Sequence, residues 1–208
     1  MTREQGVARI LLRIGAVKFA GDEPFQFSSG LLSPVYCDNR LLLGYPNERD
    51  LIVDDYLDVI EEGIGWKGVD VIAGTASSGI PFAAWIAQRI DSPMVYVRPE
   101  AKKHGQGKQV EGVLASGAKT VLIEDLVSTG GSALRAAEAL RAEGARCDHC
   151  ISILAYNVKS AKKRFLESGI HLHSLCDFSD LLEEARDRNS LPEAKIAEVR
   201  EWVEANFP

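Results

Sequence analysis

One stretch decides the fold: Val121-Leu122-Ile123-Glu124-Asp125-Leu126-Val127-Ser128-Thr129-Gly130-Gly131-Ser132. The three apolar residues after Thr120 predict a buried strand, and residues 133–143, rich in Ala, Leu, Glu and Arg, predict a helix. A strand that enters a helix through a turn of small residues points several backbone N–H groups at one spot, where the helix N-terminus adds positive potential. The sequence therefore predicts a phosphate-binding turn between the strand and the helix.

Two adjacent carboxylates, Glu124 and Asp125, stand at the predicted end of that strand. A phosphate site alone does not need them, so we expect a second polar group there, such as ribose hydroxyls or a bound Mg²⁺. The plain alternative is an acidic turn that caps a helix. The run Leu-Val-Ser-Thr-Gly-Gly-Ser that follows directly disfavours it.

Four blocks of the sequence carry a family resemblance. Residues 121–132 resemble the phosphoribosyl-pyrophosphate (PRPP) signature of type I phosphoribosyltransferases, which identifies the cosubstrate and not the base. Residues 27–40, Phe-Ser-Ser-Gly-Leu-Leu-Ser-Pro-Val-Tyr-Cys-Asp-Asn-Arg, resemble the N-terminal region of orotate phosphoribosyltransferases. Residues 98–105 are similar to that family's mobile catalytic loop, and residues 74–81 to its pyrophosphate loop. The blocks follow the family's order and span about residues 25–135.

The pattern along the chain predicts an α/β protein. We expect strands at 69–73, 94–97, 120–123, 146–155 and 170–175, and helices at 3–16, 47–64 with Asn47 as N-cap, 80–90, 133–143, 159–168, 179–189 and 192–206. Strands alternating with helices imply a parallel sheet covered on both faces, whose binding sites gather at the carboxyl ends of the strands. The resemblance implies the type I phosphoribosyltransferase fold, a central mostly parallel sheet flanked by helices, with a small N-terminal hood. We expect one domain over 1–208, with the hood at roughly 1–45 and the core at roughly 46–208.

Residues 100–119 break this pattern. The stretch holds four Gly, four Lys and one His and few large apolar residues. Loops of this length in a compact domain are functional or disordered. A solvated hairpin is the plain interpretation, but we favour a lid, because its cations suit a reaction that handles pyrophosphate.

The resemblance implies a reaction in which orotate and PRPP give orotidine 5′-monophosphate and pyrophosphate, with Mg²⁺ bound mainly through PRPP. It names Glu124, Asp125, Lys102 and His104 as the catalytic residues. The residues that it assigns to PRPP are Thr75, Ala76, Ser77, Ser78, Gly79, Arg98, Lys102, Lys103, His104, Glu124, Asp125, Leu126, Val127, Ser128, Thr129, Gly130, Gly131 and Ser132. The candidates for contact with orotate are Phe27, Ser29, Gly30, Tyr36, Arg40 and Ser128.

Some of these assignments have alternatives. Many relatives carry Lys at the positions of Ser28, Ser78 and Pro99, so the grip on orotate is the open point. Arg98 and Arg40 fit plain salt bridges as well as substrate contacts. His104 fits either a proton donor or a donor to phosphate oxygen.

Composition narrows the function further. The net charge of −6 disfavours a nucleic-acid surface, and neither a secretory signal nor a run of apolar residues long enough to span a membrane is evident. We expect a cytoplasmic protein with four free thiols, Cys147 and Cys150 being core residues and not zinc ligands. The resemblance implies a homodimer with shared active sites. Two alternatives stay open: a purine-type phosphoribosyltransferase, and a non-catalytic regulator that senses PRPP or nucleotides on the same fold.

Overall fold

A six-stranded sheet forms the centre of the computed structural model, which describes residues 1–21, 23–26, 30–100 and 108–207. Its strand order is β10-β9-β8-β5-β6-β7, and neighbouring strands are parallel except the antiparallel pair β6 and β7. The strands are β5 (Val71–Thr75), β6 (Met94–Val97), β7 (Val110–Glu111), β8 (Lys119–Val127), β9 (Arg146–Ala155) and β10 (His171–Asp177). The predicted α/β class with a mostly parallel sheet is confirmed.

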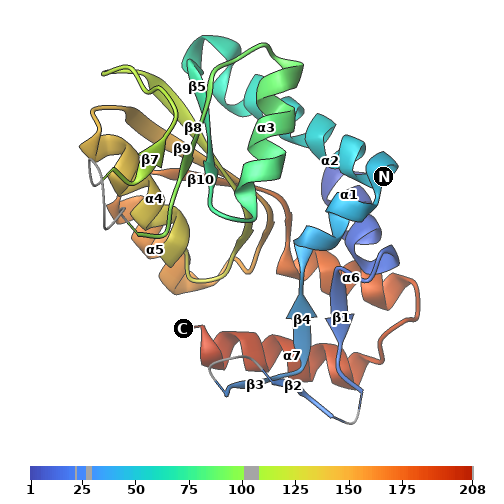
Figure 1. Ribbon diagram of the computed structural model, residues 1–208. Helices are drawn as coiled ribbons and strands as arrows, with labels where there is room; N and C mark the ends of the chain where they lie inside the picture. The colour runs from blue at the N-terminus through green and yellow to red at the C-terminus, as the bar shows by residue number, and fades with distance from the viewer. Residues whose placement is uncertain (22, 27–29, 101–107, 208) are drawn as a thin grey trace.

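Helices cover both faces of this sheet (Figure 1). The helices α1 (Arg3–Arg13), α2 (Pro46–Val59) and α3 (Gly79–Arg89) pack on one face, and α4 (Gly131–Ala142) and α5 (Lys159–Glu167) on the other. The last two helices, α6 (Phe178–Asp187) and α7 (Glu193–Asn206), follow β10. In the part of the chain that the structure describes, no helix is both long and apolar enough to cross a membrane.

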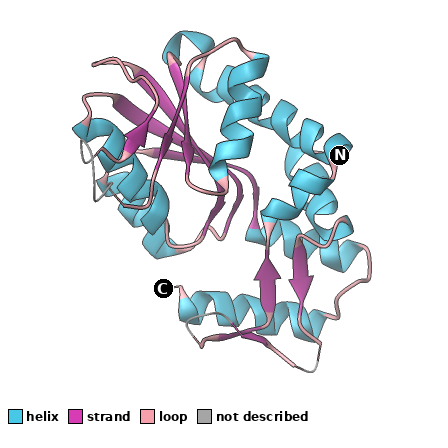
Figure 2. Cartoon of the chain, in the orientation of Figure 1, coloured by secondary structure: helices cyan, strands magenta, loops and turns pink. Residues whose placement is uncertain are grey.

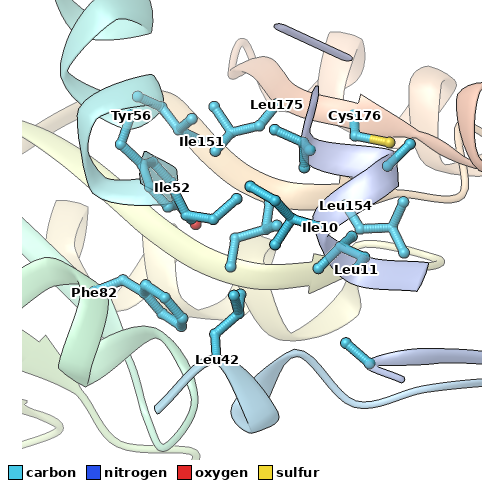
Figure 3. Close-up of a cluster of buried hydrophobic side chains, with 14 of the residues drawn as sticks. Ile10, Leu11, Leu42, Ile52, Tyr56, Phe82, Ile151, Leu154, Leu175 and Cys176 are labelled. Carbon is cyan, nitrogen blue, oxygen red and sulfur yellow. The ribbon is translucent and has the colours of Figure 1, made fainter. Parts of the chain in front are cut away.

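Successive side chains of a strand point to opposite faces of the sheet, so the hydrophobic core is divided into two clusters, one on each face. In β8, Val121 and Ile123 join the cluster that contains Tyr56 and Phe82, whereas Leu122 joins the cluster under α4 and α5. Figure 3 shows the first cluster, in which side chains from α1, α2 and α3 meet those of β9 and β10. All four cysteines carry free thiols, and Cys147 and Cys150 are buried in β9, as predicted.

The N-terminal segment builds two short antiparallel pairs apart from the main sheet (Figure 2). The strand β1 (Val17–Phe19) pairs with β4 (Val35–Cys37), and β2 (Phe25–Gln26) pairs with β3 (Leu32–Ser33). A 3₁₀ helix, η1 (Asn39–Gly44), then leads into α2. These short strand pairs stand apart from the alternating strands and helices of the main sheet, while the boundary between hood and core stays a prediction.

One local expectation was wrong. Asn47 is not an N-cap, because Pro46 already occupies the first turn of α2 and Tyr45 precedes it. The helix predicted over 47–64 is present, but after Val59 its hydrogen-bonding pattern changes to that of a π-helix, η2 (Ile60–Ile64), and the 3₁₀ turn η3 (Trp66–Gly68) follows.

Part of the stretch 100–119, which we interpreted as a lid, packs against the main sheet. Val110 and Ala118 are 5% and 7% exposed, and Val110 and Glu111 form β7 on the edge of the sheet. An apolar residue beside an open strand edge gains ladder hydrogen bonds and buries apolar surface. At Val110 this stabilisation exceeds the entropy cost of ordering a Gly-rich stretch. Residues 101–107, the centre of the predicted lid, lie outside the described residues.

Candidate active site

The carboxyl ends of β5 and β8 meet the hood at one cavity of about 300 Å³. Chain segments far apart in the sequence line it: Cys37, Asp38, Arg40, Thr75, Ala76, Ser78, Glu124, Asp125, Leu126 and Ser132. All but Cys37 and Asp38 were predicted site residues. The loops that begin near Gly74, Arg98 and Glu124 each follow a strand and were expected to converge. The first and the third do meet at this cavity, together with residues of the N-terminal segment, whereas Arg98 is not among the lining residues.

Backbone contacts hold the loop that follows β5. The Ala76–Ser77 peptide bond is cis, and the Ala76 N–H donates to the Val97 carbonyl at 2.9 Å. Gly79, the first residue of α3, lies so close to the Ile123 carbonyl that a Cβ atom there would overlap it. The hydroxyl of Thr75 is buried and has no hydrogen-bond partner among the described residues. Because Thr75 lines the cavity, this hydroxyl can donate to or accept from a bound ligand.

The acid pair lies inside β8 and not after it. Pairing with β9 continues to Val127, which faces Ala155, so the strand runs four residues past its predicted end. Glu124 is 4% exposed, and its carboxylate accepts hydrogen bonds from the Ser132 hydroxyl at 3.2 Å and from the Asp125 N–H at 3.2 Å. The two carboxylates therefore sit at fixed points on a strand, which is a more rigid support than a turn.

Burial makes this pair costly to ionise. Desolvation, followed by the charge of Asp125, raises the pKa of Glu124, and desolvation also raises the pKa of Asp125. Cations or hydroxyl donors that enter the cavity favour the ionised forms and lower both pKa values again. The pair thus suits a ligand that brings hydroxyl groups and developing positive charge.

The turn after β8 has the form expected of an anion-binding turn. Gly130 has φ of +77°, and a Cβ atom there would also overlap the Phe165 ring of α5, so only glycine fits. Arg164 of α5 donates to the Thr129 carbonyl at 3.0 Å and braces the turn from outside. Ser132 stands in the first turn of α4 and links this turn to Glu124. Val127, Ser128 and Gly131 complete the connection between strand and helix.

The hood side of the cavity presents a charged pair. Arg40 forms two hydrogen bonds with the Asp38 carboxylate, at 2.6 and 2.9 Å, and this guanidinium holds the pKa of Asp38 below its ordinary value. Arg40 thus forms the salt bridge that was one interpretation of it, while its contact with substrate stays a prediction. Tyr36 is 36% exposed and packs on Phe25, with ring centroids 5.6 Å apart. Gly30 has φ of +85°.

Several predicted residues are not placed in the cavity. Arg98, which follows β6, forms an ion pair with Glu111 at 3.5 Å, the salt-bridge alternative considered for it. Lys102, Lys103, His104, Phe27 and Ser29 lie outside the described residues.

Sequence reasoning missed four residues of this region: Cys37, Asp38, Asn39 and Tyr56. The first three lie inside the block 27–40 that carried the resemblance, but nothing in the residue types gave them a role. Tyr56 had only the signal of an aromatic residue on a helix, which is typical of core packing. No group of three or more His, Cys, Asp or Glu side chains within the described ranges is arranged to hold a metal ion.

This fold and this cavity define a phosphoribosyl transferase. The phosphoribosyl transferase domain matches residues 51–171, more than half of the chain, and the chain belongs to that family. Over 202 residues it is 42% identical to an orotate phosphoribosyltransferase of Coxiella burnetii and 46% identical to one of Listeria innocua, each time covering 97% of this chain and 96% of the relative. Within the family, the chain groups with the orotate phosphoribosyltransferases.

Solved structures agree. A crystal structure of orotate phosphoribosyltransferase from Aeropyrum pernix is 32% identical with a TM-score of 0.76, covering 86% of this chain and 98% of that one. UMP synthase of Leishmania donovani is 27% identical with a TM-score of 0.78, covering 96% of this chain and 42% of that one. An adenine phosphoribosyltransferase at 18% identity also shares the fold, with a TM-score of 0.62. The fold alone therefore does not select the base.

Proposed function

We propose that this chain transfers the phosphoribosyl group of PRPP to orotate, giving orotidine 5′-monophosphate and pyrophosphate, a step in pyrimidine biosynthesis. The observation that carries the proposal is the cavity in which the 74–81 loop, the Glu124–Asp125 pair and residues 37–40 of the hood meet. The full-length likeness to orotate phosphoribosyltransferases favours orotate over a purine base and favours an enzyme over a regulator.

Each part of the cavity has one task in this reaction. The turn over residues 127–132 binds the 5′-phosphate through backbone N–H groups and hydroxyls. Glu124 and Asp125 accept hydrogen bonds from the two ribose hydroxyls and stabilise the positive charge that develops on the ring as the bond to pyrophosphate breaks. Residues 75–79 bind the departing pyrophosphate, and Lys102 and His104 close over it. Orotate enters from the hood side, beside Tyr36 and Arg40.

The carboxylates fit a divalent cation that arrives with the substrate. Mg²⁺ in such sites is held by one or two carboxylates and by substrate phosphates, and Glu124 and Asp125 supply the protein's share. When bound, Mg²⁺ neutralises charge on the pyrophosphate group. Calorimetry should detect weak Mg²⁺ binding to the protein alone and strong binding only with PRPP; a tight stoichiometric site without PRPP would contradict this.

The proposed assembly is a homodimer in which each lid serves the neighbouring site. Four large apolar side chains, 39–54% exposed, occur in the stretch just after the hood residues of the cavity: Leu41, Leu43, Tyr45 and Leu51. Exposed apolar side chains in one segment favour a contact between subunits. Mixing the inactive variants Lys102→Ala and Asp125→Asn under conditions of subunit exchange should restore activity, because a mixed dimer then keeps one intact site. No recovery despite demonstrated exchange rejects shared sites.

We place the reaction in the cytoplasm. The four free thiols suit a reducing compartment, and three of them are buried. Cell fractionation tests this placement, and recovery of the protein outside the cytoplasmic fraction would contradict it.

The deciding test of the reaction is base selection. Pyrophosphate release should be measured with PRPP, Mg²⁺ and each of orotate, uracil, adenine, hypoxanthine and guanine. Of the five bases, we expect only orotate to cause pyrophosphate release. Release with a purine base would establish the purine-type alternative, and PRPP binding without release with any base would establish the regulator.

A further inference from the structure

Two buried side chains outside the predicted site contact the backbone of the acid pair. The Asn39 amide donates to the Asp125 carbonyl at 2.7 Å, and the Tyr56 hydroxyl donates to the Glu124 carbonyl at 2.6 Å. Asn39 is 1% exposed and Tyr56 is 0% exposed. They come from η1 and α2, segments 86 and 68 positions away in the chain from their partners.

The sheet itself explains why β8 needs such contacts here. The pairing of β8 with β5 ends at Ile123, which faces Gly74. On the other side the pairing with β9 continues in the same register, with Glu124 facing Ser152 and Leu126 facing Leu154. From Glu124 onward β8 therefore has a neighbouring strand on one side only, and buried backbone groups on the side that β5 leaves open must find other partners.

Tyr56 fixes the backbone at the first residue past the end of the pairing with β5. Its hydroxyl donates to the Glu124 carbonyl, and the side chain is fully buried in the core cluster on this face of the sheet. The bond therefore ties β8 to α2 at the point where β5 no longer supports it.

Asn39 fixes the next peptide unit from the hood side. Its neighbours Asp38 and Arg40 both line the cavity, so the same short segment bears on the substrate and on the acid pair. The Oδ1 atom of Asn39 is buried without a hydrogen-bond partner in the described part of the chain. Burying an amide that uses only half of its hydrogen-bonding capacity is unfavourable for stability. This cost is consistent with a role of the remaining bond in function.

We propose that Asn39 and Tyr56 are positioning residues for the phosphoribosyl transfer: they hold the backbone of Glu124 and Asp125 so that the two carboxylates keep the geometry that the transition state requires. The inference rests on the proposed function. Electrostatic stabilisation depends on groups that are already in place when charge develops, and a displacement of about 1 Å costs up to about 10²-fold in rate. Asn39 adds a second effect, because it ties the base side of the cavity to the ribose side.

The test begins with single variants. Tyr56→Phe and Asn39→Ala should each lower kcat for orotate by about 10-fold or more, with the KM for PRPP changed less than about 3-fold, because the positioning acts mainly in the transition state. Asn39→Asp keeps the shape but turns an acceptor toward the Asp125 carbonyl, so it should be less active than Asn39→Ala. If Asn39 only filled space, Asn39→Asp would be the more active of the two.

Asn206→Ala is the matched control. Asn206 also donates to a backbone carbonyl, that of Trp202 at 2.9 Å, and we expect this variant to keep full activity.

A double-mutant cycle separates positioning from general destabilisation. If Asn39 acts through Asp125, adding Asn39→Ala to Asp125→Asn should lower kcat by less than about 2-fold further, whereas independent effects would multiply. Multiplying losses, or single variants with unchanged kcat, overturn the inference.

A second measurement keeps this outcome distinct from failure of the proposed function. An inactive wild type with every base would reject the function itself. Calorimetry of PRPP with Mg²⁺ then still tests the inference, because it does not need a base. Asn39→Ala should weaken binding by less than about 3-fold, and a larger weakening that recurs in the Asp125→Asn background would overturn the inference, because Asn39 would then act independently of Asp125.

Discussion

Two clusters of ionisable side chains in this molecule differ in how they are held. Glu124 and Asp125 lie beside a cavity, and side chains from η1, α2 and α4 bond to them or to their backbone. His149 on β9 stacks on His171 of β10 and meets the tilted ring of His173, also on β10, with His149 Nδ1 and His173 Nε2 3.1 Å apart. Within the described residues, no other segment donates to or accepts from these imidazoles.

Burial disfavours the charged form in both places. It raises the pKa of Glu124 and of Asp125, and it lowers the pKa of His149 and of His173, with further lowering by neighbouring imidazoles. A shifted pKa therefore does not by itself mark a site. What distinguishes the acid pair is that separate segments fix it next to open space.

The largest expected difference is in catalysis. Asp125→Asn should lower kcat by roughly 10²-fold while the fold is kept, because it removes one preorganised charge from the cationic transition state. His173→Gln is the counterpart from the other cluster and should leave kcat unchanged. Steady-state kinetics of both purified proteins, with thermal unfolding as a check of folding, decide the matter. Full activity of the Asp125 variant would remove the acid pair from the mechanism.

The close approach behind the acid pair should matter for stability. Gly79→Ala places a Cβ atom against the Ile123 carbonyl, one residue before Glu124, so the free energy of unfolding should fall by about 1–3 kcal/mol. Gly44→Ala, where no atom lies within 4 Å of the added Cβ, should change it by less than about 0.5 kcal/mol. Urea unfolding compares the two, and equal losses would mean that the contact at Gly79 relaxes freely.

The hydrogen bond from Ser132 should tune the pKa of Glu124 in the acid pair. It favours the ionised form of Glu124, so Ser132→Ala should raise the pKa of Glu124 further. Because activity needs the carboxylate, kcat/KM for PRPP falls as pH decreases through this pKa. The fall should begin about one pH unit higher in the variant. A pH profile with an unchanged acid limb would show that this bond does not tune Glu124.

Protonation of the histidine cluster should have the smallest effect of the four, and it should change the free energy of unfolding but not the activity. The pKa values of His149 and His173 in the folded protein lie below the ordinary value of 6.5, so the unfolded chain binds protons first as pH falls. The free energy of unfolding is then at its full value above pH 6.5 and decreases below it, by less than about 1 kcal/mol since both rings are partly exposed. His173→Gln should flatten this dependence in urea unfolding at pH 7.5 and 5.5. A steeper dependence in the variant would reverse the interpretation. Asp148 and His171 are the neighbours to substitute next.

The sequence predicted the parts of the site that are local and missed those that are not. The turn over 127–132 is recognisable because its Gly and hydroxyl residues serve the backbone within a few positions, as Gly130 shows. The length of β8 was underestimated, because carboxylates are rare in buried strands and only pairing with β9 keeps Glu124 and Asp125 inside one.

The contacts of Asn39 and Tyr56 had no local signal at all. Their partners are backbone carbonyls in another element, and a carbonyl is the same at every position of a sequence. Arg40 shows a related limit: both of its interpretations could be written from the sequence, but the bonds to Asp38 at 2.6 and 2.9 Å depend on how η1 begins.

The link between α1 and α6 also bears on the order of events during synthesis. Arg9, near the start of the chain, bonds to the buried Glu184 at 2.8 Å, 175 positions later, and Figure 1 shows the first helix beside α6. At about 5–20 residues per second, the ribosome needs roughly 10–35 s to make the residues between them. During that time α1 lacks the cover that α6 gives it in the folded protein, although β8 and the side chains that hold its acid pair have already been made. The nascent chain therefore passes through a stage in which the acid pair and its partners exist but one side of α1 is uncovered, and a chaperone that binds apolar helices would find its target in α1 during this interval.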